Sequence, residues 1–315
     1  MKNIFSHLVC TYLILIFSFS FAQSNEEETG LKSALNGFSF RSIGPAFMSG
    51  RIADISIDPT NQNIWYVAVG SGGTWKTTNA GTTWTPLTDD ESFYSTGCIT
   101  LDPSNSSIVW LGTGENVGGR HVGIGHGIYR STDGGSSWQD MGLKQSEHIS
   151  KIIVHPNDSK TIWVASQGPL WSSGGERGLY KSTDGGKTWI NKLNINEWTG
   201  VTDLVIDPTN PDVLYLASWQ RHRNVAAHMG GGPGTSLYKS VDGGETWFKI
   251  DNGLPSSNMG KIGLAISPIN PEVLYAAIEL DRRKGAVYRS SNSGGSWTKC
   301  QIPFLEVQDL TITKS

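Results

Sequence analysis

The sequence predicts an all-β protein, a β-propeller made of four-stranded antiparallel blades. Three observations support this prediction. An eight-residue turn motif occurs five times, a strand ending in a proline turn precedes each copy, and the composition combines 38 Gly and 12 Trp with only 17% charged residues. Many tight turns between short strands, with large rings packed between the sheets, are typical of propellers and poorly suited to long helices.

The turn motif is Ser/Thr-x-Asp/Asn-x-Gly-x-Ser/Thr-Trp, an Asp box, and successive copies are 54, 51, 58 and 50 residues apart. We expect the third residue to accept hydrogen bonds from N–H groups of its own turn, the Gly to permit positive φ, and the Trp to fill the gap beside the outer strand. Turn chemistry alone explains these positions, so we assign them a structural role. The third and last residues of the copies are Asn79, Asp133, Asp184, Asp242, Asn292, Trp84, Trp138, Trp189, Trp247 and Trp297.

The proline turns divide each repeat into strands. They stand at Pro59, Pro103, Pro156, Pro208 and Pro268. A second apolar run follows each turn and completes a hairpin, because Pro presets the φ of the turn. A third strand then leads into the Asp box, and an outer strand begins at the box Trp. Each repeat is therefore one sheet that hides its faces only when neighbouring repeats stack around an axis.

These repeats give the expected domain organisation. Residues 1–22 resemble a secretory signal, with Lys2, an apolar stretch over 8–21 that is too short to span a bilayer, and a small-x-small site at Ser20-Phe21-Ala22. Residues 23–35 form a polar, disordered leader, and the propeller occupies 36–315. Its blades are predicted at approximately 50–90, 91–143, 144–194, 195–252 and 253–304.

The last residues predict a sixth blade. Residues 307–312 (VQDLTI) match the inner-strand opening at 201–206 (VTDLVI), so a further blade begins at 305. One C-terminal strand and one N-terminal strand from 38–43 leave two strands missing from a four-stranded sheet. We therefore expect an incomplete ring, the N-terminal part of a longer propeller, and a closed ring with five full boxes would contradict that expectation.

Charge, cysteines and glycines exclude several classes of function. The formal net charge of −3 becomes −4 once the signal is removed, which does not indicate a nucleic-acid surface. After export only Cys98 and Cys300 remain, and a bridge between them is left open. No further segment approaches membrane-span length. The run Gly230–Gly234 lacks a following Lys-Ser/Thr, and the loop histidines lack chelating spacing, so no cofactor and no metal are predicted.

Candidate binding residues belong to the loops between second and third strands, which antiparallel topology places opposite the Asp boxes. Long irregular loops on a rigid scaffold commonly carry function. Arginine, carboxylate and Trp together there suit a carboxylated sugar, a peptide with an acidic terminus or a glycan stacked on Trp171 or Trp219. The candidate ligand contacts are Arg120, His121, Trp171, Arg177, Trp219, Arg221, Arg223 and Arg282. The candidate catalytic carboxylates are Glu115, Glu176, Glu279 and Asp281.

The residues Phe40-Arg41-Ser42-Ile43-Gly44-Pro45, Gly112-Thr113-Gly114-Glu115-Asn116 and the box ending at Trp189 resemble bacterial sortilin-like proteins with neuraminidase-type (BNR) repeats. The likeness covers roughly residues 36–315 and implies an exported Asp-box propeller of glycosyl-hydrolase-like type. Related propellers bind peptides or hydrolyse sialosides and xyloglucan. Sialidases open with Phe-Arg-x-Pro, whereas Pro45 comes two residues late here, and no residue matches their tyrosine nucleophile.

Two functions follow as hypotheses. The first is an exported binding propeller of the sortilin-like class, whose protein, peptide or glycan ligand lies opposite the Asp boxes. The alternative is a glycoside hydrolase, sialidase-like or xyloglucanase-like, that uses the loop carboxylates. Hydrolysis requires two carboxyl groups about 5 to 9.5 Å apart across the sugar. Export leads to the periplasm, the cell surface or the medium.

Overall fold

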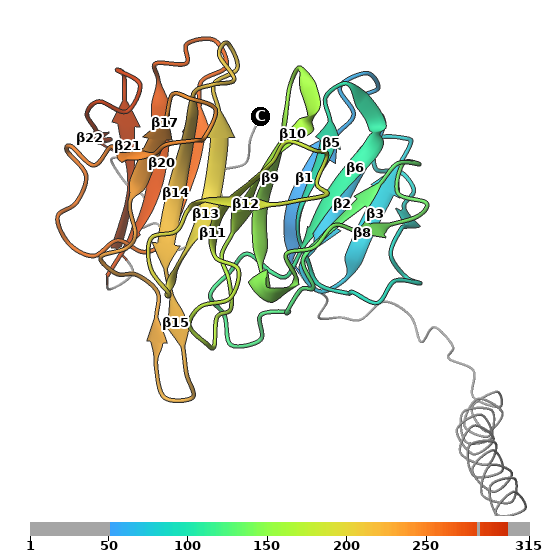
Figure 1. Ribbon diagram of the computed structural model, residues 1–315, viewed down its shortest axis with the longest axis horizontal. Helices are drawn as coiled ribbons and strands as arrows, with labels where there is room; N and C mark the ends of the chain where they lie inside the picture. Colours follow the sequence, from blue (N-terminus) through green and yellow to red (C-terminus); the bar gives the residue numbers. More distant parts are fainter. Residues whose placement is uncertain (1–50, 282–283, 302–315) are drawn as a thin grey trace, which may run out of the picture. The chain divides into compact units, whose positions relative to one another are not determined.

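The computed structural model describes residues 51–281 and 284–301. The predicted signal and leader, the strand at 38–43, Arg41, Arg282 and the start of a sixth blade lie outside the described residues. The described part is all-β apart from one 3-10 turn, η1 (Lys144–Ser146). Its strands form five four-stranded antiparallel sheets that follow one another along the chain, as predicted (Figure 1).

Each sheet is a meander from an inner to an outer strand. The first sheet is β1 (Ile52–Ile57), β2 (Trp65–Val69), β3 (Gly73–Thr77) and β4 (Thr85–Pro86). The second is β5 (Thr96–Asp102), β6 (Asn105–Thr113), β7 (Ile128–Ser131) and β8 (Gln139–Asp140). The third is β9 (Ile149–His155), β10 (Asp158–Ser166), β11 (Gly178–Ser182) and β12 (Ile190–Leu193).

The fourth sheet carries an additional hairpin. It consists of β13 (Thr199–Ile206), β14 (Leu214–Gln220), β17 (Leu237–Ser240) and β18 (Phe248–Lys249), and the hairpin is β15 (His222–Arg223) with β16 (His228–Met229). The fifth sheet is β19 (Ile262–Ile266), β20 (Leu274–Leu280), β21 (Lys284–Ser290) and β22 (Thr298–Lys299).

Each Asp box is a closed network of hydrogen bonds. In the second copy, Ser131 Oγ donates to Asp133 Oδ1 at 2.7 Å and accepts from the Gly135 N–H at 2.8 Å. Asp133 Oδ1 also accepts the Ser137 N–H at 2.9 Å, and its Oδ2 accepts the Ser137 hydroxyl at 2.6 Å. The hydrogen bonds from Ser137, followed by the one from Ser131, lower the pKa of Asp133 to about 2. The carboxylate oxygens therefore accept hydrogen bonds within their own turn and stabilise it.

Consecutive sheets pack through apolar clusters that lie between them. Tyr66 and Ala68 of the first sheet pack with Ile99 and Leu111 of the second. Equivalent clusters join the second sheet to the third, the third to the fourth and the fourth to the fifth. The second, third and fourth sheets therefore each have a neighbouring sheet on both faces, which is how repeated sheets bury their apolar core. Cys98 is buried in one of these clusters, and both Cys98 and Cys300 are free thiols.

A polar contact, which we call the inter-sheet clamp, accompanies each cluster. A cation on the third strand of one sheet lies over an aromatic ring on the second strand and donates to the carbonyl at the fourth position of the next sheet's Asp box. The ring, cation and carbonyl are Tyr66, Lys76 and Gly134; Trp110, Arg130 and Gly185; Trp163, Lys181 and Gly243; and Tyr215, Lys239 and Ser293. The four donor–carbonyl distances are 3.1, 3.2, 2.8 and 3.1 Å.

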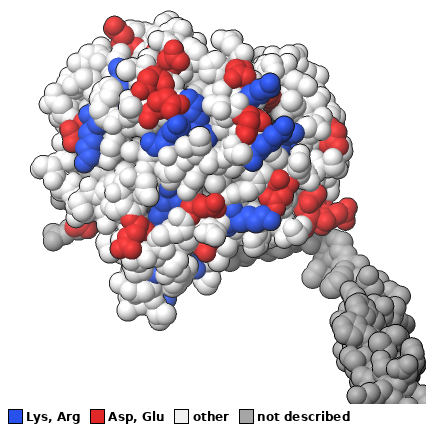
Figure 2. Space-filling model, viewed as in Figure 1, with Lys and Arg blue, Asp and Glu red and all other residues white. Residues whose placement is uncertain are grey.

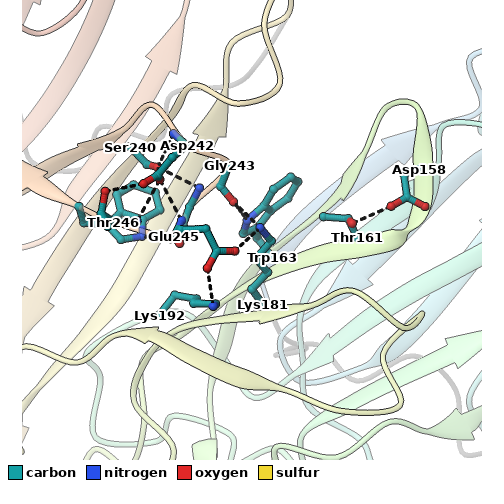
Figure 3. A network of polar contacts seen from close by, with 12 residues as sticks. Asp158, Thr161, Trp163, Lys181, Lys192, Ser240, Asp242, Gly243, Glu245 and Thr246 are labelled. Carbon is teal, nitrogen blue, oxygen red and sulfur yellow. Dashed lines mark hydrogen bonds and ion pairs between the residues drawn. The ribbon is translucent and has the colours of Figure 1, made fainter.

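The clamp between the third and fourth sheets has extra charges (Figure 3). Glu245 of the fourth Asp box accepts Lys181 Nζ at 2.7 Å and Lys192 Nζ at 2.6 Å. The Trp163 indole N–H donates to the same Gly243 carbonyl at 3.0 Å. These contacts lie at the Asp-box ends of the strands, so they hold neighbouring sheets together on the side away from the predicted ligand site.

Candidate functional site

The side opposite the Asp boxes, which we call the loop face, combines the loops between second and third strands with the linkers from each outer strand to the next inner strand. Antiparallel pairing brings both kinds of connection to one edge. Only the first kind of connection was predicted from the sequence to carry binding residues. Figure 2, drawn in the orientation of Figure 1, shows acidic and basic side chains interspersed over the surface seen from that side.

One short segment, Glu115–Gly118, makes contacts with several sheets, and we call it the bridging segment. The Asn116 carbonyl accepts Lys261 Nζ at 2.5 Å, and the Val117 carbonyl accepts Arg221 at 2.8 Å. The Asn116 side chain accepts hydrogen bonds from Gln167 and Thr202. The second sheet's loop is therefore tied to the third, fourth and fifth sheets.

Glu115 anchors the other end of this segment. It is 2% exposed, and its carboxylate meets Arg51 at 2.5 Å, accepts the Gly123 N–H at 2.9 Å and lies 3.4 Å from the Ser71 hydroxyl. All three partners are donors, so the carboxylate oxygens act as acceptors in these contacts. These contacts tie Glu115 to its own loop and to Arg51.

Two predicted ligand contacts, Arg177 and Arg221, are buried. Arg177 donates to the carbonyls of Gly174, Gln167, Ser172 and Pro169 and so shapes its own loop. Arg221 is 0% exposed and donates to Val117 and, at 3.3 Å, to the Gly168 carbonyl. Burial lowers the pKa of Arg177 to about 10 and that of Arg221 to about 9, and the nearby Arg177 charge adds to the effect on Arg221.

Trp219 lies beneath the bridging segment rather than on the surface. It is 3% exposed, and its indole N–H donates to the Gly230 carbonyl at 2.8 Å. The Arg221 guanidinium is 5.1 Å and Lys261 Nζ 5.7 Å from the ring centroid. Both cations therefore support the ring, and its faces are not accessible to a stacking sugar.

Lys261, in the linker before β19, was missed by the sequence analysis. It is half-buried, and burial lowers its pKa to about 8, with the Arg221 charge acting in the same direction. Glu147, in the linker before β9, was likewise not predicted from the sequence as a site residue. Burial raises its pKa, and Arg177 and Arg221 oppose the rise. The signal that identifies both is topological, because these linkers share the edge of the variable loops.

A second group was also missed, on the inner strands. Asp54, Cys98, Lys151 and Asp203 each stand five residues before the proline of a Pro turn, so they occupy one position of the repeat. Lys151 Nζ lies 3.4 Å from Asp54 Oδ2. Burial alone lowers the pKa of Lys151, but Asp54 and Asp203 more than compensate, and the net shift is upward.

These inner-strand carboxylates also join the sheets. Asp54 Oδ2 accepts the Ile99 N–H of the second sheet at 3.3 Å, and Asp203 Oδ2 accepts the Leu264 N–H of the fifth at 2.7 Å. Both sit at irregularities of the strand pairing. Such bulges re-aim a side chain. The carboxylates are therefore partners of the backbone and of Lys151.

The remaining predicted residues are more open. Arg120, His121, Glu279 and Asp281 are exposed, and Arg223 is half-buried. Trp171 is 45% exposed in the loop after β10. Glu176 Oε2 accepts the Gln145 N–H at 2.8 Å, and Glu279 Oε2 accepts the Lys261 N–H at 3.3 Å. The structure brings Arg177, Trp219 and Arg221 together with the bridging segment, and leaves Trp171 as an aromatic ring open to solvent on this face.

Within residues 51–281 and 284–301, His, Cys, Asp and Glu side chains do not gather in groups of three or more that could hold an ion. In the same ranges no helix is long and apolar enough to cross a membrane.

Comparisons with known proteins agree on the fold. The family model described as Sortilin-Vps10, neurotensin receptor 3, matches residues 126–230. A solved GH74 enzyme from Niastella koreensis has a TM-score of 0.59 and 22% identity over 79% of this chain and 38% of that chain. An ancestral GH74 enzyme has a TM-score of 0.62 and 22% identity over 84% of this chain and 32% of that chain.

Curated relatives are mainly xyloglucanases. A Paenibacillus xyloglucanase is 25% identical over 291 residues, covering 83% of this chain and 27% of that protein. A Hypocrea jecorina xyloglucanase is 27% identical over 229 residues, covering 64% and 26%. The photosystem II assembly lipoprotein Ycf48 from a Synechococcus strain is 28% identical over 184 residues, covering 58% and 41%. The chain therefore has a β-propeller fold, and it spans about a quarter of the length of the xyloglucanases that it resembles.

Proposed function

We propose that this chain is an exported, glycoside-hydrolase-like propeller whose loop face binds a neutral polysaccharide of the xyloglucan type. The observation that carries the proposal is the similarity to a xyloglucanase over 83% of the chain. This reverses the order of the two hypotheses drawn from the sequence, in which binding of the sortilin-like class came first.

The state of the loop-face cations supports a neutral ligand. Arg177 and Arg221 are buried, and each donates to backbone carbonyls. Lys261 is likewise bonded to the Asn116 carbonyl. Cations in this condition build the surface instead of offering ion pairs to an acidic ligand. A neutral glycan needs hydroxyl-bonding groups and an open ring, and the half-exposed Trp171 supplies the ring.

Cleavage requires a separate argument. Glu115 is buried against Arg51, and Glu176 accepts the Gln145 N–H. Glu279 and Asp281 are the predicted carboxylates most exposed to a substrate, and Glu279 also accepts the Lys261 N–H at 3.3 Å. They come from the same end of β20, so a second carboxylate across the sugar is needed for either to act.

The test is affinity electrophoresis of the purified chain in gels with xyloglucan, with polygalacturonate as the acidic control and an acidic peptide by titration calorimetry. We expect retardation by xyloglucan alone, and loss of most of it in Trp171→Ala. The matched control is Trp84→Phe, at an exposed ring of an Asp box. Binding of the acidic ligands with no retardation by xyloglucan would overturn the proposal.

A reducing-sugar assay on xyloglucan then separates binding from hydrolysis. If the chain cleaves, Glu279→Gln or Asp281→Asn is expected to reduce the rate at least about a hundredfold while the mobility shift remains. Cleavage that survives both substitutions would remove these carboxylates from the reaction.

Peptide binding is the second candidate, and the Sortilin-Vps10 match over residues 126–230 favours it. That range contains the loop of Arg177 and the hairpin β15–β16. The calorimetric titration above tests it directly, because a peptide ligand gives heat of binding that Trp171→Ala leaves unchanged.

A further inference from the structure

The linker before β9 is strained in its backbone. Leu143 and Glu147, at the two ends of η1, have φ of 55° and 61°, in the left-handed region that disfavours residues with a side chain. Hydrogen bonds from the loops on either side hold the linker in place. The Gly125 N–H donates to the Glu147 carbonyl at 2.8 Å, and the Gln167 N–H donates to the His148 carbonyl at 3.0 Å. Strain of this kind persists only where the surroundings enforce it.

The His148 side chain lies at the end of this linker and is buried against the bridging segment. It is 1% exposed, and its ring hydrogen-bonds to the backbone of Glu115. Its Nδ1 atom has no hydrogen-bond partner among residues 51–281 and 284–301. The nitrogen that donates to the Glu115 carbonyl is therefore Nε2, and a second proton on the imidazole would have to occupy Nδ1, where those residues supply no acceptor.

The charges around His148 also oppose a second proton. Burial first, and then the charge of Arg221 directly after β14 and that of Arg177 in the loop before β11, hold the pKa of His148 well below its ordinary value of 6.5. The nearest acid of the bridging segment does not compensate, because the Glu115 carboxylate is paired with Arg51. An imidazolium at this position would therefore be buried between two guanidinium groups.

Three other titratable groups face the same loops. Burial raises the pKa of Glu147, so this group acts with the opposite sign and favours the closed loops as the pH falls. Lys261 has its pKa lowered to about 8 and is protonated throughout the acid range. His228 lies beside Gly118 and is exposed, and burial lowers its pKa, so it acts in the same direction as His148 from the surface.

We propose that mild acid opens the loop face through His148: protonation of this buried imidazole releases the bridging segment and the strained linker, while the Asp-box edge stays folded. The opened state takes up the proton with the ordinary pKa of 6.5, whereas the closed state does not. The opening equilibrium is therefore expected to rise about tenfold for each pH unit below 6.5. This goes beyond the proposed function and concerns the chain without a ligand.

Hydrogen exchange of the 315-residue chain between pH 7 and pH 5, corrected for the intrinsic exchange rate at each pH, measures the opening. The amides of Gly125 and Gln167, which donate to the linker, are expected to lose protection about tenfold per pH unit below 6.5. The buried amides of Gly135 and Gly186 in the Asp boxes are the internal reference and are expected to keep their protection.

Substitutions assign the effect to one imidazole. His148→Gln keeps an N–H for the Glu115 carbonyl but does not titrate, so its loop-face protection is expected to be independent of pH in this range. His228→Gln is the matched control and is expected to retain most of the slope. Glu147→Gln removes the opposing group and is expected to be at least as steep as the parent. Circular dichroism at pH 7 checks that each variant is folded.

The parent chain supplies a second reading that needs no substitution. NMR of the His148 ring is expected to show a neutral imidazole as long as the loop face is closed. A His148 that titrates near 6.5 while Gly125 and Gln167 stay protected would overturn the proposal. So would a loop-face slope no steeper than that of the Asp boxes, a slope that His148→Gln leaves intact, or one that only His228→Gln abolishes.

Discussion

The two edges of the sheets use the same kind of contact in different ways. At the Asp-box edge a cation donates to a backbone carbonyl in each of the four interfaces, always from the same position of the repeat. At the loop face cations also donate to carbonyls, but Arg221 reaches Val117 across 104 residues and Lys261 reaches Asn116 across 145. These two side-chain contacts span distant parts of the chain, whereas backbone bonds of the same edge, such as Gly114 N–H to the Ser95 carbonyl and Gln167 N–H to the His148 carbonyl, recur from sheet to sheet.

The difference separates contacts that belong to the repeat from contacts that are particular to the loop face. The box edge fixes the distance between sheets, and each clamp lies over an aromatic ring. The loop face connects sheets that are not neighbours, through one segment, Glu115–Gly118. The Asp-box edge is therefore stabilised by equivalent contacts in each interface. The bridging segment is held by contacts that differ from one sheet to the next.

The largest expected effect comes from a substitution that disrupts sheet packing at the Asp-box edge. In Gly186→Ala, the new Cβ would lie 2.6 Å from the Trp110 ring, at a φ of +84° that L side chains rarely adopt. Strain and overpacking together are expected to lower the free energy of unfolding by about 3 kcal/mol, measured by urea denaturation.

Gly185→Ala is the matched control. It has a similar φ of +79°, but its nearest neighbour would be the Arg130 guanidinium at 3.8 Å. This variant is expected to lose only the strain, about 1 kcal/mol. Equal losses in the two variants would show that the close approach of the sheets at Trp110 does not limit the size of the box residue.

The sequence predicted the box edge well because its determinants are local. Spacing of the Trp residues, the Pro turns and the Gly positions fixed the four-stranded sheets, and the all-β prediction is confirmed. What the repeat did not reveal is the second requirement on the box Gly. Positive φ is a property of the turn itself, whereas contact with Trp110 depends on how two sheets pack.

The loop face was predicted only as a location. Arg177 and Arg221 were identified as candidates, but their burial depends on where the bridging segment lies, and nothing near them in the chain encodes that. Lys261 was overlooked because it stands in a linker that resembles ordinary surface. Glu115 was predicted as a candidate from its residue type and loop position, and its contact with Arg51, 64 residues away, has no signal in the sequence.

The second prediction concerns the loop face and tests how the stability contribution of the Lys261 amine changes with pH. The pKa of Lys261 is lowered from an ordinary 10.5 to about 8 in the folded state. Between these values the unfolded chain binds more protons than the folded chain, so this group makes stability rise with pH. Relative to Lys261→Met, the parent is expected to gain about 2 kcal/mol between pH 8 and 10, measured by urea denaturation at each pH. A constant difference between the two proteins would contradict the burial of this amine.

The third prediction concerns the extra charges of the third and fourth sheets. Glu245→Gln removes two ion pairs from a side chain that is 47% exposed, so the loss is expected to be about 0.5 to 1 kcal/mol and smaller at high salt. Hydrogen bonds from Lys181, then Lys192, lower the pKa of Glu245 from 4.5. The contribution is therefore present above pH 4.5 and disappears as the pH falls through the folded-state pKa. Thermal unfolding at two salt concentrations measures it.

The smallest expected effect is a gain in stability from a substitution at the Asp-box edge. Ser293 occupies the fourth box position with φ 57, where three other boxes have Gly at 71, 79 and 69. Its carbonyl receives Lys239, so the backbone shape is needed and the side chain is not. Ser293→Gly is expected to raise the free energy of unfolding by about 0.5 kcal/mol, since relief of left-handed strain slightly exceeds the greater entropy of Gly in the unfolded chain. The reverse change, Gly243→Ser in the fourth box, is expected to cost a similar amount, and opposite signs in the two urea titrations would establish that the position has one conformational requirement in every sheet.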